Sequence, residues 1–138
     1  MTQMTAQEKQ AFLADLHVGV LSIPDPGRGP LTVPVWYQYE PGGELWFLTG
    51  ARSRKGKLLS EGTGISLCAQ NEQPPYQYVT VEGVVDSIAP VADEGLPMAV
   101  RYLGKEQGAQ YHNSGASDDS IVVRFTPRQW LAVDYSKT

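Results

Sequence analysis

The sequence predicts a mainly β fold with flanking helices, built as a small antiparallel barrel of about six strands. Short runs rich in Val, Ile, Leu and aromatic residues recur along the chain, and clusters of Gly and Pro separate them. Helix signals occur at the start, between the third and fourth strands, and late in the chain. Because the 138 residues contain no internal repeat and no linker, a single domain over residues 1–138 is expected.

Composition narrows the class of protein. The net charge of −4, with 41% apolar and 19% charged residues, is typical of an ordinary globular protein and argues against nucleic-acid binding. No apolar stretch is long enough to predict a membrane span. The single cysteine, Cys68, excludes an intrachain disulfide and a cysteine-built metal site. A cytoplasmic protein is the expectation.

The N-terminal half begins with a helix and continues with strands. Residues 5–8 form a capping-box pattern, so a helix is expected from there to about His17. Strands are expected at residues 18–23, 31–39 and 45–49. Pro34 predicts that its strand lies at an edge or a bulge, because proline cannot donate a hydrogen bond to a neighbouring strand.

The C-terminal half also contains signals for strands and helices. Strands are expected at residues 63–70, 76–89 and 120–125, and Gly83 predicts a bulge or bend within the long one. A helix is expected from about Asp93, and residues 104–117 are expected to be helix plus loop. A break at Thr126 and Pro127 precedes the last segment, residues 130–135.

Positive charge is concentrated in one segment of this acidic chain. Four of the eleven basic residues, Arg52, Arg54, Lys55 and Lys57, fall within six positions between a predicted strand and a short helix that ends near Glu61. Free N–H groups at a helix start, together with Ser, Arg and Lys side chains, suit a phosphate group. The alternative is a solvated surface helix, the usual reading of a charge run.

Other polar and aromatic residues give weaker signals. Trp36 lies on the strand face opposite Val33 and Val35, so it must meet something other than the core, either a dimer partner or a ring system. His17 and His112 have no acidic residue at metal-ligand spacing, so no metal site is predicted. No catalytic acid or base stands out. The polar-aromatic stretch at residues 101–112 could be the solvent-exposed face of a helix or could line a substrate entrance.

Four sequence pieces in order, residues 32–37, 48–49, 53–55 and 78–83, resemble the pyridoxamine 5′-phosphate oxidase-like split-barrel superfamily. The resemblance extends from Val18 to Tyr135 and is strongest to the short flavin- and deazaflavin-dependent oxidoreductases of actinobacteria. It implies a six-stranded antiparallel split β-barrel that forms a homodimer with two cofactor sites at the subunit interface.

The resemblance also assigns cofactor contacts. Main-chain groups along the ring would come from Thr32, Val33, Pro34 and Val35. Contacts beside the ribityl chain and the phosphate would come from Leu48 and Thr49. The phosphate clamp would consist of Ser53, Arg54 and Lys55, with Lys57 as an addition. Gln77 or Tyr78 would reach the ring, and Trp130 would pack near the cofactor from the partner subunit.

The function that this resemblance implies is hydride transfer between a bound ring cofactor and a small organic substrate, with a proton from solvent or from a tyrosine. The deazaflavin coenzyme F-420 is favoured modestly over FMN because the chain is short and carries the segment 34–37 together with Lys55 and Lys57. The C-terminal Arg-Leu segment of true pyridoxamine phosphate oxidases is missing, so that reaction is not expected. The alternatives are a cofactor- or haem-binding module without turnover, or an interaction domain that has lost its cofactor.

Overall fold

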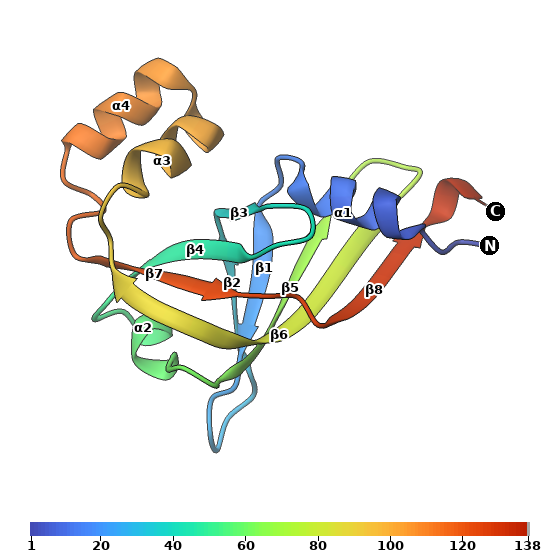
Figure 1. Cartoon of the computed structure of the whole chain (residues 1–138), viewed down its shortest axis with the longest axis horizontal. Coiled ribbons are helices and arrows are strands. Elements are labelled where there is room, and N and C mark those ends of the chain that lie inside the picture. Colours follow the sequence, from blue (N-terminus) through green and yellow to red (C-terminus); the bar gives the residue numbers. More distant parts are fainter. Residues whose placement is uncertain (138) are drawn as a thin grey trace.

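A strongly curved antiparallel sheet forms the body of the molecule in the computed structural model, which describes residues 1–137 (Figure 1). Helices occupy α1 (Ala6–Ala14), α2 (Arg54–Leu58), α3 (Gly95–Leu103) and α4 (Lys105–Asn113), and a 3-10 turn spans Tyr135–Lys137. The strands are β1 (Gly19–Ile23), β2 (Leu31–Val35), β3 (Tyr37–Tyr39), β4 (Leu45–Gly50), β5 (Gly64–Gln70), β6 (Gln77–Pro90), β7 (Ser120–Phe125) and β8 (Gln129–Asp134).

The strand order is β2-β1-β5-β6-β7-β4-β3, and β8 pairs with β6 outside this path. The 14-residue β6 joins the two halves of the barrel, because its first part pairs with β5 and β8 and its last part pairs with β7. In Figure 1 the α3–α4 hairpin lies at one end of the molecule and both chain termini lie at the other. The predicted mainly β, antiparallel split barrel with flanking helices is confirmed.

The number of strands differs from the prediction, since the described residues form eight rather than six. The segment 31–39 is two strands, because the chain leaves one half of the barrel and enters the other at Trp36. On one side of this break Val35 pairs with Gly19 of β1, and on the other Tyr37 pairs with Phe47 of β4. The last segment adds β8, which pairs with the first part of β6.

Two single-residue predictions concern the sheet. The edge position of Pro34 is confirmed, since β2 pairs only with β1 among the described strands. A bulge was predicted at Gly83, but the irregularity lies further along β6, where the β6–β7 register shifts between Val85 and Ser87. Gly83 has a packing role, because a Cβ there would lie 2.6 Å from the Thr126 carbonyl oxygen.

Helix α1 closes one side of the barrel, and its buried Leu13 joins the core. The capping box at Thr5 and Glu8 is present, as predicted. The helix ends at Ala14 rather than near His17, because Asp15 is extended and the carbonyls of Ala14 and Asp15 accept hydrogen bonds from Arg101, each at 3.0 Å.

The core lies inside the curved sheet. It consists of the buried apolar side chains that the strands direct inward, together with one residue each from α1 and the end of α2: Leu13, Leu21, Ile23, Val35, Tyr37, Tyr39, Leu45, Phe47, Leu59, Ile65, Leu67, Ala69, Val79, Val81, Val85, Val123 and Phe125. Burying this much apolar surface is the main source of stability of the barrel.

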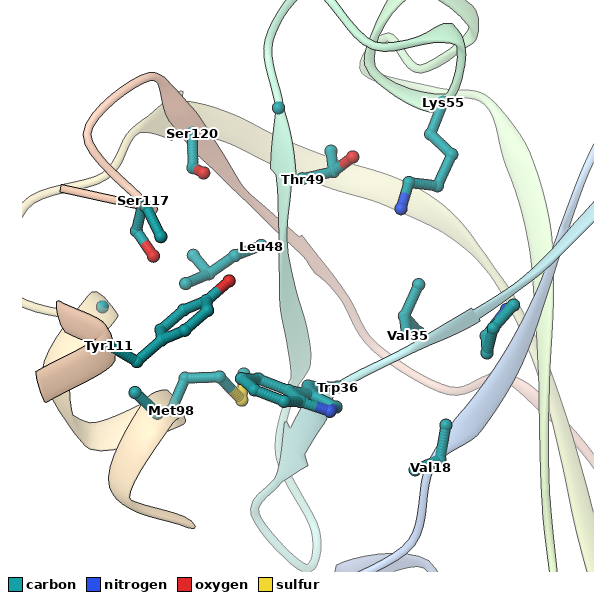
Figure 2. A pocket seen from close by; sticks show the side chains of 15 residues that line it. Val18, Val35, Trp36, Leu48, Thr49, Lys55, Met98, Tyr111, Ser117 and Ser120 are labelled. Atoms are coloured by element: carbon teal, nitrogen blue, oxygen red, sulfur yellow. The ribbon is translucent and has the colours of Figure 1, made fainter. Parts of the chain in front are cut away.

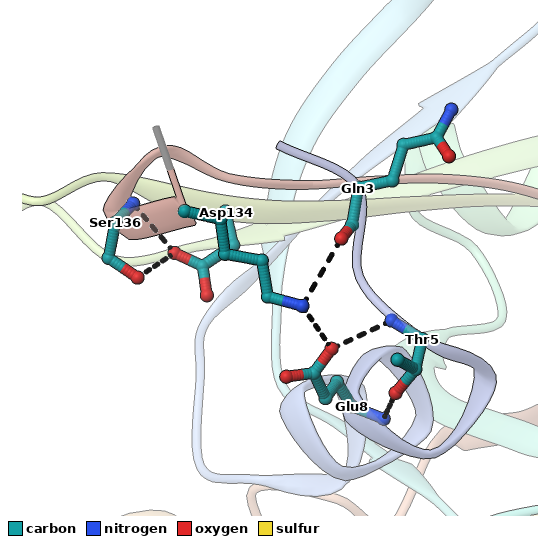
Figure 3. A network of polar contacts seen from close by, with 6 residues as sticks. Gln3, Thr5, Glu8, Asp134 and Ser136 are labelled. Atoms are coloured by element: carbon teal, nitrogen blue, oxygen red, sulfur yellow. Dashed lines mark hydrogen bonds and ion pairs between the residues drawn. The ribbon is translucent and has the colours of Figure 1, made fainter. Parts of the chain in front are cut away.

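Polar contacts hold the two ends of the chain together (Figure 3). The Nζ atom of Lys137 lies 2.6 Å from Glu8 Oε1 and 3.3 Å from the Gln3 carbonyl. The hydrogen bond from Lys137, and after it the one from the Thr5 N–H, hold the pKa of Glu8 below its usual value. The termini therefore close one end of the barrel, away from the α3–α4 hairpin. Among residues 1–137, no helix is both long and apolar enough to cross a membrane.

Candidate functional site

A cleft of about 560 Å³ opens beside β4, between the β2–β3 junction and the α3–α4 hairpin (Figure 2). Its volume is within the range of small-molecule sites, roughly 300–1,000 Å³. The residues that line it are Val18, Pro34, Val35, Trp36, Leu48, Thr49, Gly50, Lys55, Gly95, Met98, Ala99, Tyr111, Ala116, Ser117 and Ser120.

Five of the predicted cofactor residues meet in this cleft. Pro34 and Val35 come from the end of β2, Leu48 and Thr49 from β4, and Lys55 from the first turn of α2. They are separated in sequence by up to 21 positions, and they come together because β3, which follows β2 directly in the chain, pairs with β4. The structure thus brings residues that were predicted to contact the cofactor ring close to residues that were predicted to contact its ribityl chain and phosphate.

The basic segment does not act as one cluster. Arg52 pairs with Asp119 at 3.0 Å, and Arg54 pairs with Asp25, so both guanidinium groups have an acidic partner. Lys57 is exposed to solvent and does not line the cleft. Lys55 is the one charged residue of the described chain that lines the cleft, and Figure 2 shows its amine directed inward.

Ser53 shapes the turn that presents Lys55. Its hydroxyl donates to the Gly50 carbonyl at 2.7 Å and accepts from the Gly56 N–H at 3.1 Å, which caps α2. Because the Ser53 hydrogen is committed to Gly50, the Thr49 hydroxyl is the donor in the 3.2 Å contact between Thr49 Oγ1 and Ser53 Oγ. Ser53 therefore positions Thr49 and Lys55 and does not itself line the cleft.

Gly56 allows this turn to pack closely against β4. A Cβ at this position would lie 2.3 Å from the Gly50 carbonyl oxygen and 2.8 Å from that of Ala51. A side chain of any kind is therefore excluded unless α2 moves away from the strand. Glycine at position 56 is what lets Lys55 reach over the end of β4.

Two further predicted residues of β2 do not line the cleft. The Thr32 side chain is exposed, and its hydroxyl lies 3.4 Å from the Pro30 carbonyl. Val33 packs against the core. Their side chains thus contribute nothing to the cleft of a single chain, and the main-chain contacts with a ring remain predictions.

The remaining predicted residues lie elsewhere on the barrel. Gln77 is tied to Asn71, whose side-chain amide donates to Gln77 Oε1 at 2.8 Å, and neither Gln77 nor its neighbour Tyr78 lines the cleft. Trp130 packs edge-on against Tyr39 at 5.9 Å in its own chain. The contact of Trp130 with a partner's cofactor remains a prediction.

Trp36 lies at the break between β2 and β3 and forms an aromatic wall. Its indole stacks on the ring of Tyr102 with a centroid distance of 5.0 Å and an interplanar angle of 4°, and the ring of Tyr111 is tilted against it at 5.6 Å. The sequence indicated that Trp36 meets something outside the core. The partner is an aromatic residue of α3 in the same chain, and Trp36 also lines the cleft.

Tyr102 and Arg101 fix the α3–α4 hairpin to the barrel. The Tyr102 hydroxyl lies 2.6 Å from the His17 carbonyl, and it accepts from the Tyr37 N–H at 2.9 Å. Burial raises the pKa of Tyr102 above its usual value, so the hydroxyl stays protonated. Arg101 Nε donates to the Tyr37 carbonyl at 3.1 Å. These two residues of the polar-aromatic stretch are thus structural.

Sequence reasoning missed the contribution of the α3–α4 region, which supplies Met98, Tyr111, Ser117 and neighbouring small residues to the cleft. The available signal was Tyr111, an aromatic residue in an otherwise polar helix. Its meaning depended on the hairpin folding back over β4, which the sequence pattern did not define.

The histidines lie outside the cleft lining. Nε2 of His17 and Nδ1 of His112 are buried and have no hydrogen-bond partner among the described residues. Burial lowers the pKa of His17, which favours the neutral ring. Within residues 1–137 there is no group of His, Cys, Asp and Glu side chains that could hold a metal ion.

The cleft therefore combines one cation and a threonine hydroxyl at one end with apolar and aromatic side chains and the hydroxyls of Ser117 and Ser120 elsewhere. This donor set fits a planar ring cofactor that carries a phosphate. A phosphate takes charge-assisted hydrogen bonds from an amine, and a ring packs against apolar walls. No side chain of the described cleft carries a negative charge that would oppose such a group.

Comparisons with known proteins agree with this architecture. The family model described as Pyridoxamine 5′-phosphate oxidase matches residues 5–134. A conserved hypothetical protein from Mycobacterium tuberculosis is 22% identical with a TM-score of 0.78, covering 97% of this chain and 87% of its own. A structure described as an F-420 reductase is 18% identical with a TM-score of 0.70, covering 88% of this chain and 94% of its own.

A further similar structure is described as the FAD and heme binding protein from Mycobacterium smegmatis. It is 12% identical with a TM-score of 0.67, covering 97% of this chain and 73% of its own. At these identities the structural likenesses show the fold alone. A search of the curated proteins found no match.

Proposed function

Because the chain belongs to the pyridoxamine 5′-phosphate oxidase family, we propose that it is an oxidoreductase that binds a flavin-type cofactor in the cleft beside β4. The observation that carries this proposal is Lys55, the one charged group of the described cleft lining, next to Thr49 and opposite an aromatic wall. Lys55 would bind the phosphate of the cofactor, and the Thr49 hydroxyl would lie beside it.

The chemistry that such a cofactor supplies when bound is the transfer of a hydride between its ring and a substrate. The chain's own residues would bind the cofactor and orient its ring. Pro34, Val35 and Leu48 provide an apolar wall that excludes water from the ring, and Lys55 fixes the phosphate end. Because the cofactor would transfer the hydride, the protein does not need to supply an acid–base pair. The described cleft lining contains no acidic side chain and no histidine.

Coenzyme F-420 is the cofactor that we favour, with FMN as the alternative. The F-420 reductase with the same fold supports this choice, as does the resemblance to the short deazaflavin-dependent enzymes. Oxidation of pyridoxamine phosphate is not part of the proposal. A cytoplasmic location is part of the proposal and is compatible with a chain that has one cysteine.

The test is a titration of cofactor-free protein with F-420 and with FMN, followed by ring fluorescence and by calorimetry. Binding of F-420 at one site per chain, with weaker binding of FMN, is the expected result. A preference for FMN would move the protein to the FMN-dependent members of the family. Binding of neither compound would contradict the proposed function.

A second candidate is a cofactor-binding or haem-binding module without turnover, which the fold of the FAD and heme binding protein supports. Neither histidine lines the cleft of the described chain, so a haem there would lack a histidine ligand from this subunit. The two functions differ in whether the reduced cofactor is reoxidised. We expect rapid reoxidation by added acceptors, whereas a storage module would hold the cofactor reduced.

We also propose that the protein is a homodimer in which the partner completes the cleft. On the outer face of the sheet, a row of cross-strand neighbours carries no charge. It consists of Leu131, Thr80, Cys68, Val20 and Pro34. The row begins at Leu131, whose side chain is 56% exposed, and ends at Pro34, which lines the cleft. A second copy packed on this row would therefore reach the mouth of the site.

Replacing Leu131 with arginine is expected to convert the dimer to a monomer without unfolding it, because the charge would enter an apolar interface while the position is exposed in the single chain. The measurement is molar mass by light scattering after gel filtration. Leu96→Arg, at a 41% exposed leucine of α3, is the matched control and should remain dimeric. A Leu131→Arg protein with the wild-type dimer mass would contradict this interface.

A further inference from the structure

The polar end of the cleft, formed by Lys55 and Thr49, carries less positive charge than the basic segment contains. Lys55 directs its amine into the cleft (Figure 2), and within residues 1–137 no acidic side chain pairs with it. Arg54 precedes Lys55 directly and carries the same charge, but it does not line the cleft. The two neighbouring cations therefore differ in what they are free to bind.

Arg54 is paired with Asp25, which belongs to the loop between β1 and β2. The guanidinium Nη2 donates a hydrogen bond to Asp25 Oδ2. The side chain of Asp25 is only 13% exposed, so its carboxylate would be poorly solvated without Arg54. Removing one partner from a shielded ion pair is unfavourable, because the other charge is left uncompensated. Asp25 therefore neutralises Arg54 outside the cleft lining.

The charge of a phosphate decides how well it suits a site with a single cation. A phosphate monoester such as FMN carries close to two negative charges near neutral pH, whereas the phosphodiester of F-420 carries one. Doubling the charge doubles the attraction to one cation, because the Coulomb energy is proportional to the product of the charges. The cost of taking an ion out of water rises with the square of its charge, so it increases about fourfold. One cation therefore favours the singly charged phosphate.

We propose that Asp25 determines cofactor specificity. By pairing with Arg54, it leaves Lys55 as the one cation of the described cleft that can meet the cofactor phosphate, so the cleft prefers a phosphodiester to a phosphate monoester. Asp25 is a positioning residue, because it acts through Arg54 and does not line the cleft. The proposal rests on the proposed function, since it concerns the phosphate that Lys55 would bind.

Three ligands with the same ring and ribityl chain separate charge from ring binding. Riboflavin has no phosphate, riboflavin 5′-methylphosphate is a phosphodiester, and FMN is the monoester. Their dissociation constants are measured with the full chain by ring fluorescence and calorimetry at one ionic strength. The wild-type protein is expected to bind the diester about threefold more tightly than FMN.

Asp25→Asn keeps the shape of the side chain and releases Arg54 from its ion pair. The positive charge gained acts twice as strongly on a dianion as on a monoanion, so affinity should rise about tenfold for FMN and about threefold for the diester. Affinity for uncharged riboflavin should stay within about twofold of wild type. If Asp25 only supported the fold, its loss would change the affinities for all three ligands alike.

Two further variants test whether the effect passes through Arg54. Asp25→Asn/Arg54→Gln removes both charges of the pair, so its three affinities should equal those of the wild-type protein. Asp119→Asn is the matched control, because Asp119 pairs with Arg52 of the same basic segment through side chains that are 67% and 86% exposed. An exposed ion pair contributes little, so FMN affinity should stay within about twofold of wild type.

A wild-type preference for FMN over the diester, or no selective gain for FMN in Asp25→Asn, would overturn the proposal. An equal gain in Asp119→Asn, or a gain that persists in the double variant, would also overturn it. A loss of FMN affinity in the double variant would show that Arg54 itself binds the phosphate, and this result counts against the proposal even if Asp25→Asn does not fold. Failure of the proposed function is distinct, because the wild-type protein would then bind neither F-420 nor any of the three flavins.

Discussion

Replacing Gly56 with alanine is expected to destabilise the protein and to abolish most of its cofactor affinity. The added Cβ would lie 2.3 Å from the Gly50 carbonyl oxygen and 2.8 Å from that of Ala51. Both contacts are with main chain, which cannot rotate away as a flexible side chain can. Helix α2 must therefore shift, and the hydrogen bond from the Gly56 N–H to Ser53 Oγ is lost with it.

The expected cost to the free energy of unfolding is about 3 kcal/mol, the upper range for overpacking a tightly fitted position. Because Lys55 precedes Gly56 in the same turn, its amine moves with the helix, and cofactor affinity should fall at least about tenfold. Thermal unfolding and calorimetry measure the two effects. The matched control is Gly64→Ala, where a Cβ would have no neighbour within 4 Å. Wild-type values for Gly56→Ala would show that α2 is not seated as described.

The sequence was sufficient for features that depend on local chemistry. The capping box at Thr5 and Glu8 predicted the start of α1, because all its hydrogen bonds lie within one turn. Pro34 predicted an edge strand, because the missing N–H is a property of that residue alone. The strand-to-helix junction at Ser53 was likewise readable, since its contacts join residues three to four positions apart.

Features that depend on distant residues were not predictable in the same way. The basic segment read as a four-residue clamp, but Arg52 and Arg54 pair with acidic residues that are 67 and 29 positions away. The end of α1 at Ala14 depends on Arg101, which is 87 positions away. The break at Trp36 depends on which strands flank it. Its stacking partner, Tyr102, belongs to α3, a helix that the sequence predicted without defining how it packs on the barrel.

The same distinction explains the candidate site. Pro34, Val35, Leu48, Thr49 and Lys55 were assigned through the family resemblance of short segments, and the fold brings these segments of β2, β4 and α2 to one cleft. Trp36 and Tyr111 face each other because the α3–α4 hairpin returns to the barrel, where Arg101 and Tyr102 anchor it. That return is a tertiary feature, so the half of the cleft under the hairpin could be described only once the fold was known.

Lys55 is the one cation that we propose to hold the phosphate of a ring cofactor. Lys55 and Lys57 lie two positions apart in the same short helix, but only Lys55 lines the cleft, so the two lysines form a matched pair. Removing a charge-assisted hydrogen bond to a phosphate is expected to cost about 1.5–3 kcal/mol, which is roughly a 10- to 150-fold loss of affinity.

The most direct measurement is therefore the dissociation constant of F-420, and of FMN, for wild-type protein and for the Lys55→Ala and Lys57→Ala variants at one ionic strength. Lys57→Ala should bind within about twofold of wild type, because an exposed cation contributes little. Lys55→Ala alone is expected to lose at least about tenfold in affinity. Equal affinities for the two variants, or a larger loss for Lys57→Ala, would contradict the proposed role of Lys55.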